Sequence, residues 1–190
     1  FFITYFLILY KMKTCFTVCS DASFSDCGMY RWNLKRRISS NKNSLIFIGL
    51  NPSKADSQLD DPTIRRLSSF ARRWDYGSLI VLNLFAKISS SPSILERSSD
   101  PVGYRNNDEL GKWIDRWSHN PFFELWLGWG NKGILRSRNL EIISILKINE
   151  IVRRSHYPSA SGPLAIGLTL KGNPRHPLYL SNRASLRPLD

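Results

Sequence analysis

The chain has 190 residues, which is long enough for one domain with a substantial hydrophobic core. A content of 42% hydrophobic and 22% charged residues is typical of a folded protein and excludes a disordered or collagen-like chain. The 27 Lys and Arg residues outnumber the 15 Asp and Glu residues, giving a formal net charge of +12. This excess favours a polyanionic partner such as nucleic acid. A basic chain that is merely soluble, or one that binds anionic lipid, is the alternative.

The first ten residues, Phe1 to Tyr10, are almost wholly apolar. A membrane-spanning helix needs about 20 such residues, so this segment is too short to span, and we expect no membrane association. It also lacks the basic start and the cleavage site of a signal peptide. We interpret residues 1–11 as translated upstream sequence, with a buried first strand as the alternative, and expect residues 12–190 to form a single α/β catalytic domain.

Three cysteines, Cys15, Cys19 and Cys27, follow this segment. Structural zinc and iron–sulfur sites usually need four ligands, and this spacing matches none of the common sets. We therefore expect no metal site. Free thiols are typical of a reducing compartment, so the sequence predicts a cytoplasmic protein.

The first elements of the chain alternate between strand and helix patterns. Residues 30–38 alternate in polarity and predict an edge strand or a hairpin arm. Ser44–Leu50 is a continuous apolar run, typical of a parallel strand buried on both faces. Asp61 and Pro62 are suited to the N-cap and first turn of a helix that runs to Asp75. The inward side of this helix is predicted to carry Ile64, Leu67, Phe70, Ala71 and Trp74.

The same alternation continues to the end of the chain. Further strands are predicted at Leu79–Phe85, Phe122–Gly128 and Leu164–Thr169, and helices at Asn106–Trp117 and Arg136–Leu146. In the last helix, the residues expected to face inward are Leu140, Ile143 and Leu146. Alternating strands and helices of this length predict one three-layer α/β/α domain with a central, mainly parallel, four-stranded sheet.

Polar residues follow the end of each predicted strand, where sites form in such sheets. They are Asn51, Asp56 and Asp61 after the first strand, Asn83 in the second, Trp129 after the third, and Asn173, Arg175 and His176 after the last. Each also has a structural interpretation: Asn51 as a turn residue, Asp61 as an N-cap, Trp129 as core and His176 as a loop residue. Asn83 is the hardest to explain in this way, because a buried amide without partners is costly.

Several common catalytic motifs do not occur in the sequence. There is no Gly-x-Gly-x-x-Gly, no Walker loop, no His-Glu-x-x-His and no Gly-x-Ser-x-Gly. Their absence argues against dinucleotide binding, nucleoside triphosphate chemistry, zinc proteolysis and ordinary serine hydrolysis.

Six short segments together resemble a bacterial and phage family catalogued as domain-of-unknown-function family 1643. They are Gly49–Asp56, Asp60–Arg66, Asn83–Ala86, Asp100–Gly103, Trp129–Gly130 and Pro174–Leu180. The resemblance covers about residues 30–180, and it names no activity.

A more distant resemblance is to the uracil-DNA glycosylase superfamily, whose landmarks occur in a similar order. Gly49–Ser53 resembles the loop in which an Asn orients the attacking water, which implies that role for Asn51. Asn83 resembles the Asn that hydrogen-bonds the flipped base. Asn173–Leu178 resembles the late loop that stabilises the leaving base and enters the duplex, although Arg175 and His176 depart from its Ser-containing pattern.

Taken together, the residues and this resemblance predict a monofunctional DNA glycosylase that acts on a flipped uracil, mismatched pyrimidine or modified pyrimidine such as a phage modified cytosine. It would leave an abasic site, in repair or in phage defence. The expected catalytic residues are Asn51, Asp56, Asp61 and His176. The expected substrate-binding residues are Pro52, Ser53, Asn83, Phe85 and Trp129, and the expected nucleic-acid-binding residues are Arg65, Arg66, Lys132, Lys171, Asn173 and Arg175.

No cofactor is expected, because a positioned water can attack the oxocarbenium-like sugar. Lys54 is a weak candidate for Schiff-base chemistry, so lyase activity is not expected. The partner is expected to be duplex DNA, bound by a monomer. The alternatives are a nucleotide or nucleoside hydrolase and a nucleic-acid-binding module without catalysis.

Overall fold

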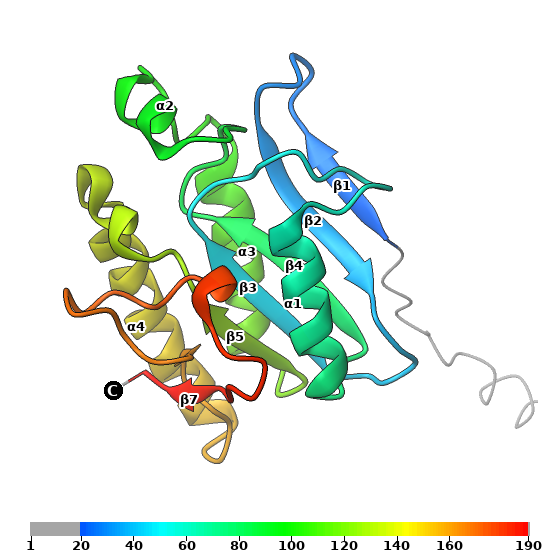
Figure 1. Cartoon of the computed structure of the whole chain (residues 1–190). Coiled ribbons are helices and arrows are strands. Elements are labelled where there is room, and N and C mark those ends of the chain that lie inside the picture. The colour runs from blue at the N-terminus through cyan, green and yellow to red at the C-terminus, as the bar shows by residue number, and fades with distance from the viewer. Residues whose placement is uncertain (1–19, 190) are drawn as a thin grey trace, which may run out of the picture.

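A computed structural model describes residues 20–189, apart from the side chain of Pro92. The segment 1–11, interpreted above as upstream sequence, and Cys15 and Cys19 lie outside the described residues. Within them, a twisted sheet has helices on both faces (Figure 1). The three-layer α/β/α arrangement predicted from the sequence is therefore present.

The sheet has seven strands in the order β1-β2-β4-β3-β5-β6-β7. Their bounds are β1 Asp21–Phe24, β2 Arg31–Arg37, β3 Ser44–Gly49, β4 Ser78–Asn83, β5 Phe123–Leu127, β6 Leu164–Ala165 and β7 Arg187–Pro188. Strands β4, β3, β5 and β6 pair in parallel, whereas β1–β2, β2–β4 and β6–β7 pair antiparallel. The sheet is therefore mixed.

The expectation of a four-stranded, mainly parallel sheet is thus not confirmed. The four apolar segments do form neighbouring parallel strands, but β1, β2 and β7 extend the sheet on both sides. The short edge strands β1 and β7 carry no continuous apolar run, which is the signal that reveals buried strands. The expected strand Leu164–Thr169 is only two residues long, because the chain turns back at Gly167, whose φ is 72°.

Four α-helices and two short 3₁₀ segments complete the fold. They are α1 Pro62–Arg73, α2 Pro92–Arg97, α3 Asn106–Ser118, η1 Asn131–Ser137, α4 Arg138–His156 and η2 Pro177–Tyr179. Helix α1 begins as predicted, because the Asp61 carboxylate accepts a hydrogen bond of 2.9 Å from the Ile64 N–H. Helix α4 begins two residues later than predicted, after Arg136 and Ser137 adopt left-handed φ values of 53° and 56°.

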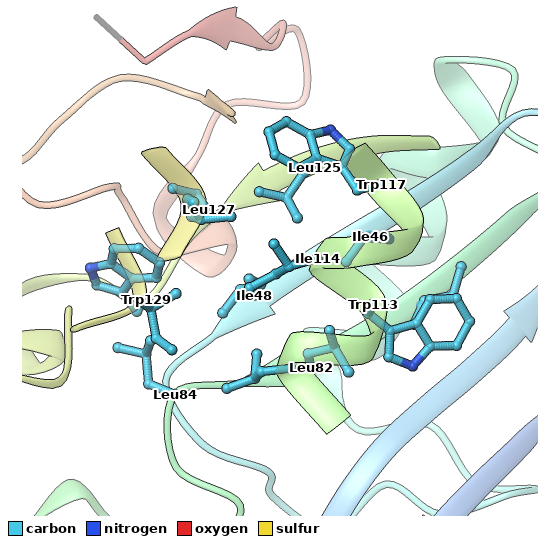
Figure 2. Close-up of a cluster of buried hydrophobic side chains, with 14 of the residues drawn as sticks. Ile46, Ile48, Leu82, Leu84, Trp113, Ile114, Trp117, Leu125, Leu127 and Trp129 are labelled. Carbon is cyan, nitrogen blue, oxygen red and sulfur yellow. The ribbon is translucent and has the colours of Figure 1, made fainter. Parts of the chain in front are cut away.

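The two faces of the sheet bury different side chains of the same strand. In β3, Leu45 and Phe47 pack in the cluster with α1, whereas Ile46 and Ile48 pack in the cluster with α3 and α4. This alternation follows from the two-residue period of a strand. Figure 2 shows the second cluster, in which indole rings of α3 lie against the aliphatic side chains of the sheet.

The inward face of α4 differs from the prediction. Leu140 is 60% exposed, so its assignment to the core is wrong, whereas Ile142 and Leu146 are buried and Ile143 is half-buried. The inward face also carries two buried arginines, Arg138 and Arg153. Their side chains bond backbone carbonyls of the interior, and a search for apolar periodicity cannot detect such residues.

The chain connections change direction at the carboxyl ends of β3 and β5. The chain leaves β3 through α1 toward β4, and leaves β5 through α4 toward β6, in the opposite direction along the sheet. Such a switch point is the usual ligand position in α/β sheets. None of the helices described between residues 20 and 189 is long and apolar enough to cross a membrane.

Candidate active site

Two glycines and one aromatic ring pack closely at the carboxyl ends of β3 and β5. A Cβ at Gly49 would lie 2.8 Å from Phe47 Cε1 and 3.0 Å from Asn83 Oδ1, and a Cβ at Gly128 would lie 2.5 Å from Phe47 Cε2. Both strand ends therefore require glycine for the Phe47 ring to occupy this position. The ring in turn lies on the α1 side of the sheet, where the loops after β3, β4 and β6 meet.

Asn83 is the last residue of β4 and has an unfilled hydrogen-bonding capacity. It is 4% exposed, and its Nδ2 has no partner within the described part of the chain. Its backbone carbonyl accepts a hydrogen bond of 3.2 Å from the Asn106 side-chain amide, which fixes the end of the strand. The Asn83 side-chain Nδ2 has no such bond to a described residue. Because buried amides are normally bonded, this one is a candidate ligand group.

Asn51 follows β3 and is half-buried. Its side-chain amide donates to the Pro52 carbonyl at 2.9 Å and to the Ser89 carbonyl at 2.8 Å. These two bonds use both amide hydrogens and fix the orientation of the group. Its Oδ1 therefore remains available as an acceptor, which is the role required of a residue that orients a water.

His176 is half-buried near the end of β5, with its Cβ 3.7 Å from the position of a Cβ on Gly130. Its Nδ1 accepts a hydrogen bond of 3.4 Å from the Leu178 N–H. Burial lowers the pKa of His176, and the Asp61 carboxylate opposes this effect more weakly. The imidazole is therefore neutral at pH 7, with its proton on Nε2, and can donate one hydrogen bond.

The two aspartates expected to be catalytic accept hydrogen bonds from nearby backbone N–H groups. Asp61 caps α1, as its alternative interpretation states. Asp56 accepts from the backbone N–H groups of Gln58 at 2.8 Å and Leu59 at 2.7 Å, and these bonds lower its pKa. Asp56 thus closes a turn, which leaves its catalytic role without support. Asp61 still affects the site electrostatically. Its negative charge favours the protonated forms of His176 and Arg31 and so partly offsets the burial that lowers their pKa values.

Sequence reasoning missed Arg31, the first residue of β2. Ser23 pairs with Asn33 and Phe24 with Arg31, so Trp32 is an extra residue that forms a bulge. The Arg31 guanidinium donates from Nη1 to the Ala55 carbonyl at 2.7 Å, which places it under the loop between β3 and α1. Burial lowers the pKa of Arg31 to about 10, so it remains charged at neutral pH. No sequence pattern signals a bulge at this position.

Phe85 and Trp129 were expected to bind substrate, but both belong to the core under α3 and α4. Phe85 is 0% and Trp129 1% exposed. Figure 2 shows the Trp129 ring beside Leu84 and Leu127. Their assignment as substrate contacts is therefore not supported, and the core interpretation holds for Trp129. Of the other expected contacts, Pro52 is buried and Ser53 half-buried in the loop after Asn51.

Four of the six residues expected to bind nucleic acid have internal partners. Arg66 donates to the carbonyls of Pro177 and Leu180 and thereby joins α1 to the C-terminal segment. Lys132 forms an ion pair of 2.6 Å with Glu96. Asn173 is 5% exposed and bonds within its own loop. Arg65 is exposed on α1 but donates to the Asp60 carbonyl, whereas Lys171 and Arg175 are exposed on the loop after β6.

A cavity of about 590 Å³ lies at the opposite edge of the sheet, near the amino end of β5. Its lining includes Glu124, Arg153, His156, Tyr157 and Ser161. None of its lining residues belongs to the polar residues described at the carboxyl ends of the strands. Between residues 20 and 189 there is no cluster of three or more His, Cys, Asp or Glu side chains that could hold a metal ion.

Fold and site together define a three-layer α/β protein with a polar site at the carboxyl ends of its parallel strands. The family described as "Protein of unknown function (DUF1643)" matches residues 31–178, and the chain belongs to this family. No curated protein and no solved structure matches the chain.

Proposed function

We propose that this protein is a monofunctional DNA glycosylase. The observation that carries the proposal is a set of three polar groups at one edge of the sheet that have no hydrogen-bond partner among residues 20–189: Asn51 Oδ1, Asn83 Nδ2 and His176 Nε2. The distant resemblance to the uracil-DNA glycosylase superfamily, carried by Gly49–Ser53 and Asn83, supports the same activity.

In the proposed reaction a water donates a hydrogen bond to Asn51 Oδ1 and turns a lone pair toward the anomeric carbon of the sugar. The glycosidic C–N bond breaks as the water oxygen forms the new bond to that carbon. The neutral His176 donates from Nε2 to the pyrimidine oxygen on which negative charge grows. The departing base then takes a proton from solvent, and the water loses one, so no cofactor is needed.

Asn83 is proposed to read the Watson–Crick edge of the flipped base, since an amide offers both a donor and an acceptor. Its Oδ1 lies close to Gly49, and the Phe47 ring lies below both strand ends. A pyrimidine would then lie against an apolar floor with its polar edge on the buried amide. Uracil, a mismatched pyrimidine and a modified cytosine all fit this description, and repair and phage defence are both compatible roles.

The loop after β6 is the proposed contact with the duplex. The Thr169 N–H bonds the Asn173 carbonyl at 2.8 Å and the Gly172 N–H bonds the Thr169 carbonyl at 2.9 Å, which makes a tight turn. Leu170 is fully exposed at its tip, next to Lys171. An apolar side chain held in water by an ordered turn is suited to the gap that a flipped base leaves between stacked neighbours. We propose that a cytoplasmic monomer binds the duplex in this way.

The test is base excision from duplexes that carry uracil, mismatched thymine or modified cytosine, followed by alkali and detection of strand breaks. Asn51→Ala is expected to lower the single-turnover rate by about 100-fold, because the water loses its acceptor. Asn43→Ala is the matched control, since Asn43 is exposed just before β3 at the other edge of the sheet.

Tight, salt-sensitive binding of every duplex without breaks would instead identify a binding module. An absence of both binding and breaks, together with cleavage of free nucleosides or nucleotides, would identify the hydrolase alternative.

A further inference from the structure

We infer that Arg31 binds a phosphate group of the nucleotide substrate, so that the site combines a base-reading amide with a buried guanidinium. This inference rests on the proposed function for the identity of the site, and it adds an anion-binding residue that the sequence did not indicate.

The guanidinium of Arg31 is incompletely bonded although it is almost wholly buried. The residue is 2% exposed, its Nη1 donates to the Ala55 carbonyl, and its Nε–H has no acceptor among residues 20–189. No carboxylate of these residues lies within 4 Å of it. Buried charges are normally paired and fully hydrogen-bonded, because an unpaired one costs several kcal/mol.

Arg36, a second buried arginine of the same strand, is paired with a carboxylate, and Arg31 is not paired with any carboxylate of residues 20–189. Arg36 forms an ion pair of 2.8 Å with Asp60 and also donates to the Asp56 carbonyl. Arg31 has the negative charge of Asp61 nearby, but the like charge of Arg36 opposes it, and one oxygen of the Asp61 carboxylate is already used to cap α1. The positive charge of Arg31 therefore remains partly uncompensated by the protein.

The position of Arg31 results from a specific backbone feature. The bulge at Trp32 changes the direction of the side chains along β2, and bulges are frequent beside active sites for this reason. The Arg31 side chain thereby reaches the loop between β3 and α1, which begins with Asn51 and ends at Asp61. Because the Nε–H is buried in this structure, the inference requires that the loop shift for a phosphate to reach it.

Phosphate is the ligand chemistry that best fits these facts. The planar guanidinium forms two parallel hydrogen bonds to a phosphate, and the bond is stronger where water is excluded. Helix α1, with 12 residues, also begins beside this loop, and its N-terminal end favours an anion. The phosphate can belong to a DNA strand or to a free nucleotide, and the experiment distinguishes the two sources.

The test compares charged and neutral phosphates. Duplexes with uracil are made with a neutral methylphosphonate on either side of the target nucleotide, and affinity is measured by fluorescence anisotropy. For wild-type protein, one of the two replacements is expected to weaken binding by about 10-fold, the effect of one charge-assisted hydrogen bond. Arg31→Gln is expected to weaken binding of the charged duplex equally and to abolish the effect of the replacement.

Two further variants control for folding. Arg31→Lys keeps the charge and is expected to restore part of the affinity, whereas Arg37→Gln changes an exposed arginine of the same strand and should not alter the methylphosphonate effect. The negative slope of log K against log salt concentration should become less steep by about 0.9 for Arg31→Gln. The wild-type comparison of charged and neutral duplexes requires no variant at all.

A second arm measures calorimetric binding of deoxyuridine monophosphate and of deoxyuridine. Arg31-dependent binding of the monophosphate alone, with no duplex binding, would support the phosphate role but overturn the glycosylase proposal. Arg31-dependent duplex binding without base excision would do the same. If both methylphosphonate duplexes bind wild-type protein like the charged one and the monophosphate binds no better than the nucleoside, the inference about Arg31 is overturned, whatever the excision assay shows.

Discussion

Two buried arginines at opposite edges of the sheet differ in how completely the protein satisfies them. Arg153, near the amino end of β5, donates to the carbonyls of Ser161 at 2.9 Å, Asn120 at 3.0 Å and Phe123 at 2.9 Å, and also to that of Trp117. Arg31, near the carboxyl end of β4, donates to one carbonyl and has a free Nε–H. Both are at most 2% exposed.

This difference gives Arg153 a structural role and leaves Arg31 as a candidate functional residue. At the amino edge, one guanidinium joins α3, α4, β5 and the loop that follows α4, so its donors are used within the fold. At the carboxyl edge, Asn83 has the same unfilled capacity as Arg31. The open donors at the carboxyl edge include an amide and a guanidinium, which are suited to bind a polar ligand, whereas those left open at the amino edge include the Trp117 indole N–H and the Ser161 hydroxyl.

The largest expected effect is the difference in stability between variants that remove each of the two guanidinium groups in turn. Arg153→Met should lower the free energy of unfolding by about 3–5 kcal/mol, because four buried or part-buried carbonyls lose their donor. Arg31→Met should lower it by about 1 kcal/mol or less, since one carbonyl is affected and an uncompensated charge is removed. Urea unfolding of the two variants measures the difference. Equal losses of unfolding free energy would show that the two guanidinium groups contribute equally to stability, which would contradict this comparison.

A smaller effect is expected from the glycines of the site. Gly128→Ala should destabilise the protein by about 1–3 kcal/mol, because its Cβ would overlap the Phe47 ring and overpacking forces neighbours to shift. Gly111→Ala is the control, since Gly111 lies within α3 with open space around its Cβ position. It should stabilise the protein by about 0.5–1 kcal/mol. Thermal melts of both variants test the close approach at the carboxyl edge, and two changes of the same sign would contradict it.

The smallest effect concerns the pH dependence of stability. Burial keeps His176 neutral and lowers its pKa below 6.5, so the unfolded chain takes up a proton first as the pH falls. Stability is therefore complete above about pH 6.5 and decreases as the pH falls from there toward the folded-state pKa. His176→Gln should remove this part of the slope when unfolding is followed between pH 5 and 7. An unchanged slope would place His176 in water rather than in the site.

The sequence predicted those parts of the fold whose signal is local. The runs at β3, β4 and β5 are apolar throughout because both faces of these strands are buried, and each strand was found within two residues of its observed bounds. The start of α1 was found because Asp61 and Pro62 act within one turn. Asn51, Asn83 and His176 were selected because strand ends of parallel neighbours meet at one edge, and all three lie at loops or strand ends of that edge.

Burial was harder to predict, because a residue type does not reveal its partners. Trp129 and Phe85 were taken for binding residues from their position after strands, yet α3 and α4 cover both. Arg66 and Lys132 were taken for phosphate contacts from their charge, yet each meets an acceptor from a distant part of the chain, 111 and 36 residues away. Charge and aromaticity describe what a side chain can do, and only the packing of other elements decides whether it is free to do it.

The sequence by itself therefore determined the α/β class and the parallel centre of the sheet, because these depend on apolar runs and on the order of elements along the chain. The tertiary structure alone decided the seven-stranded mixed sheet, the inward face of α4 and the position of Arg31. The reason is physical in each case: short edge strands pair through backbone groups, buried arginines bond distant carbonyls, and a bulge depends on the register of two strands.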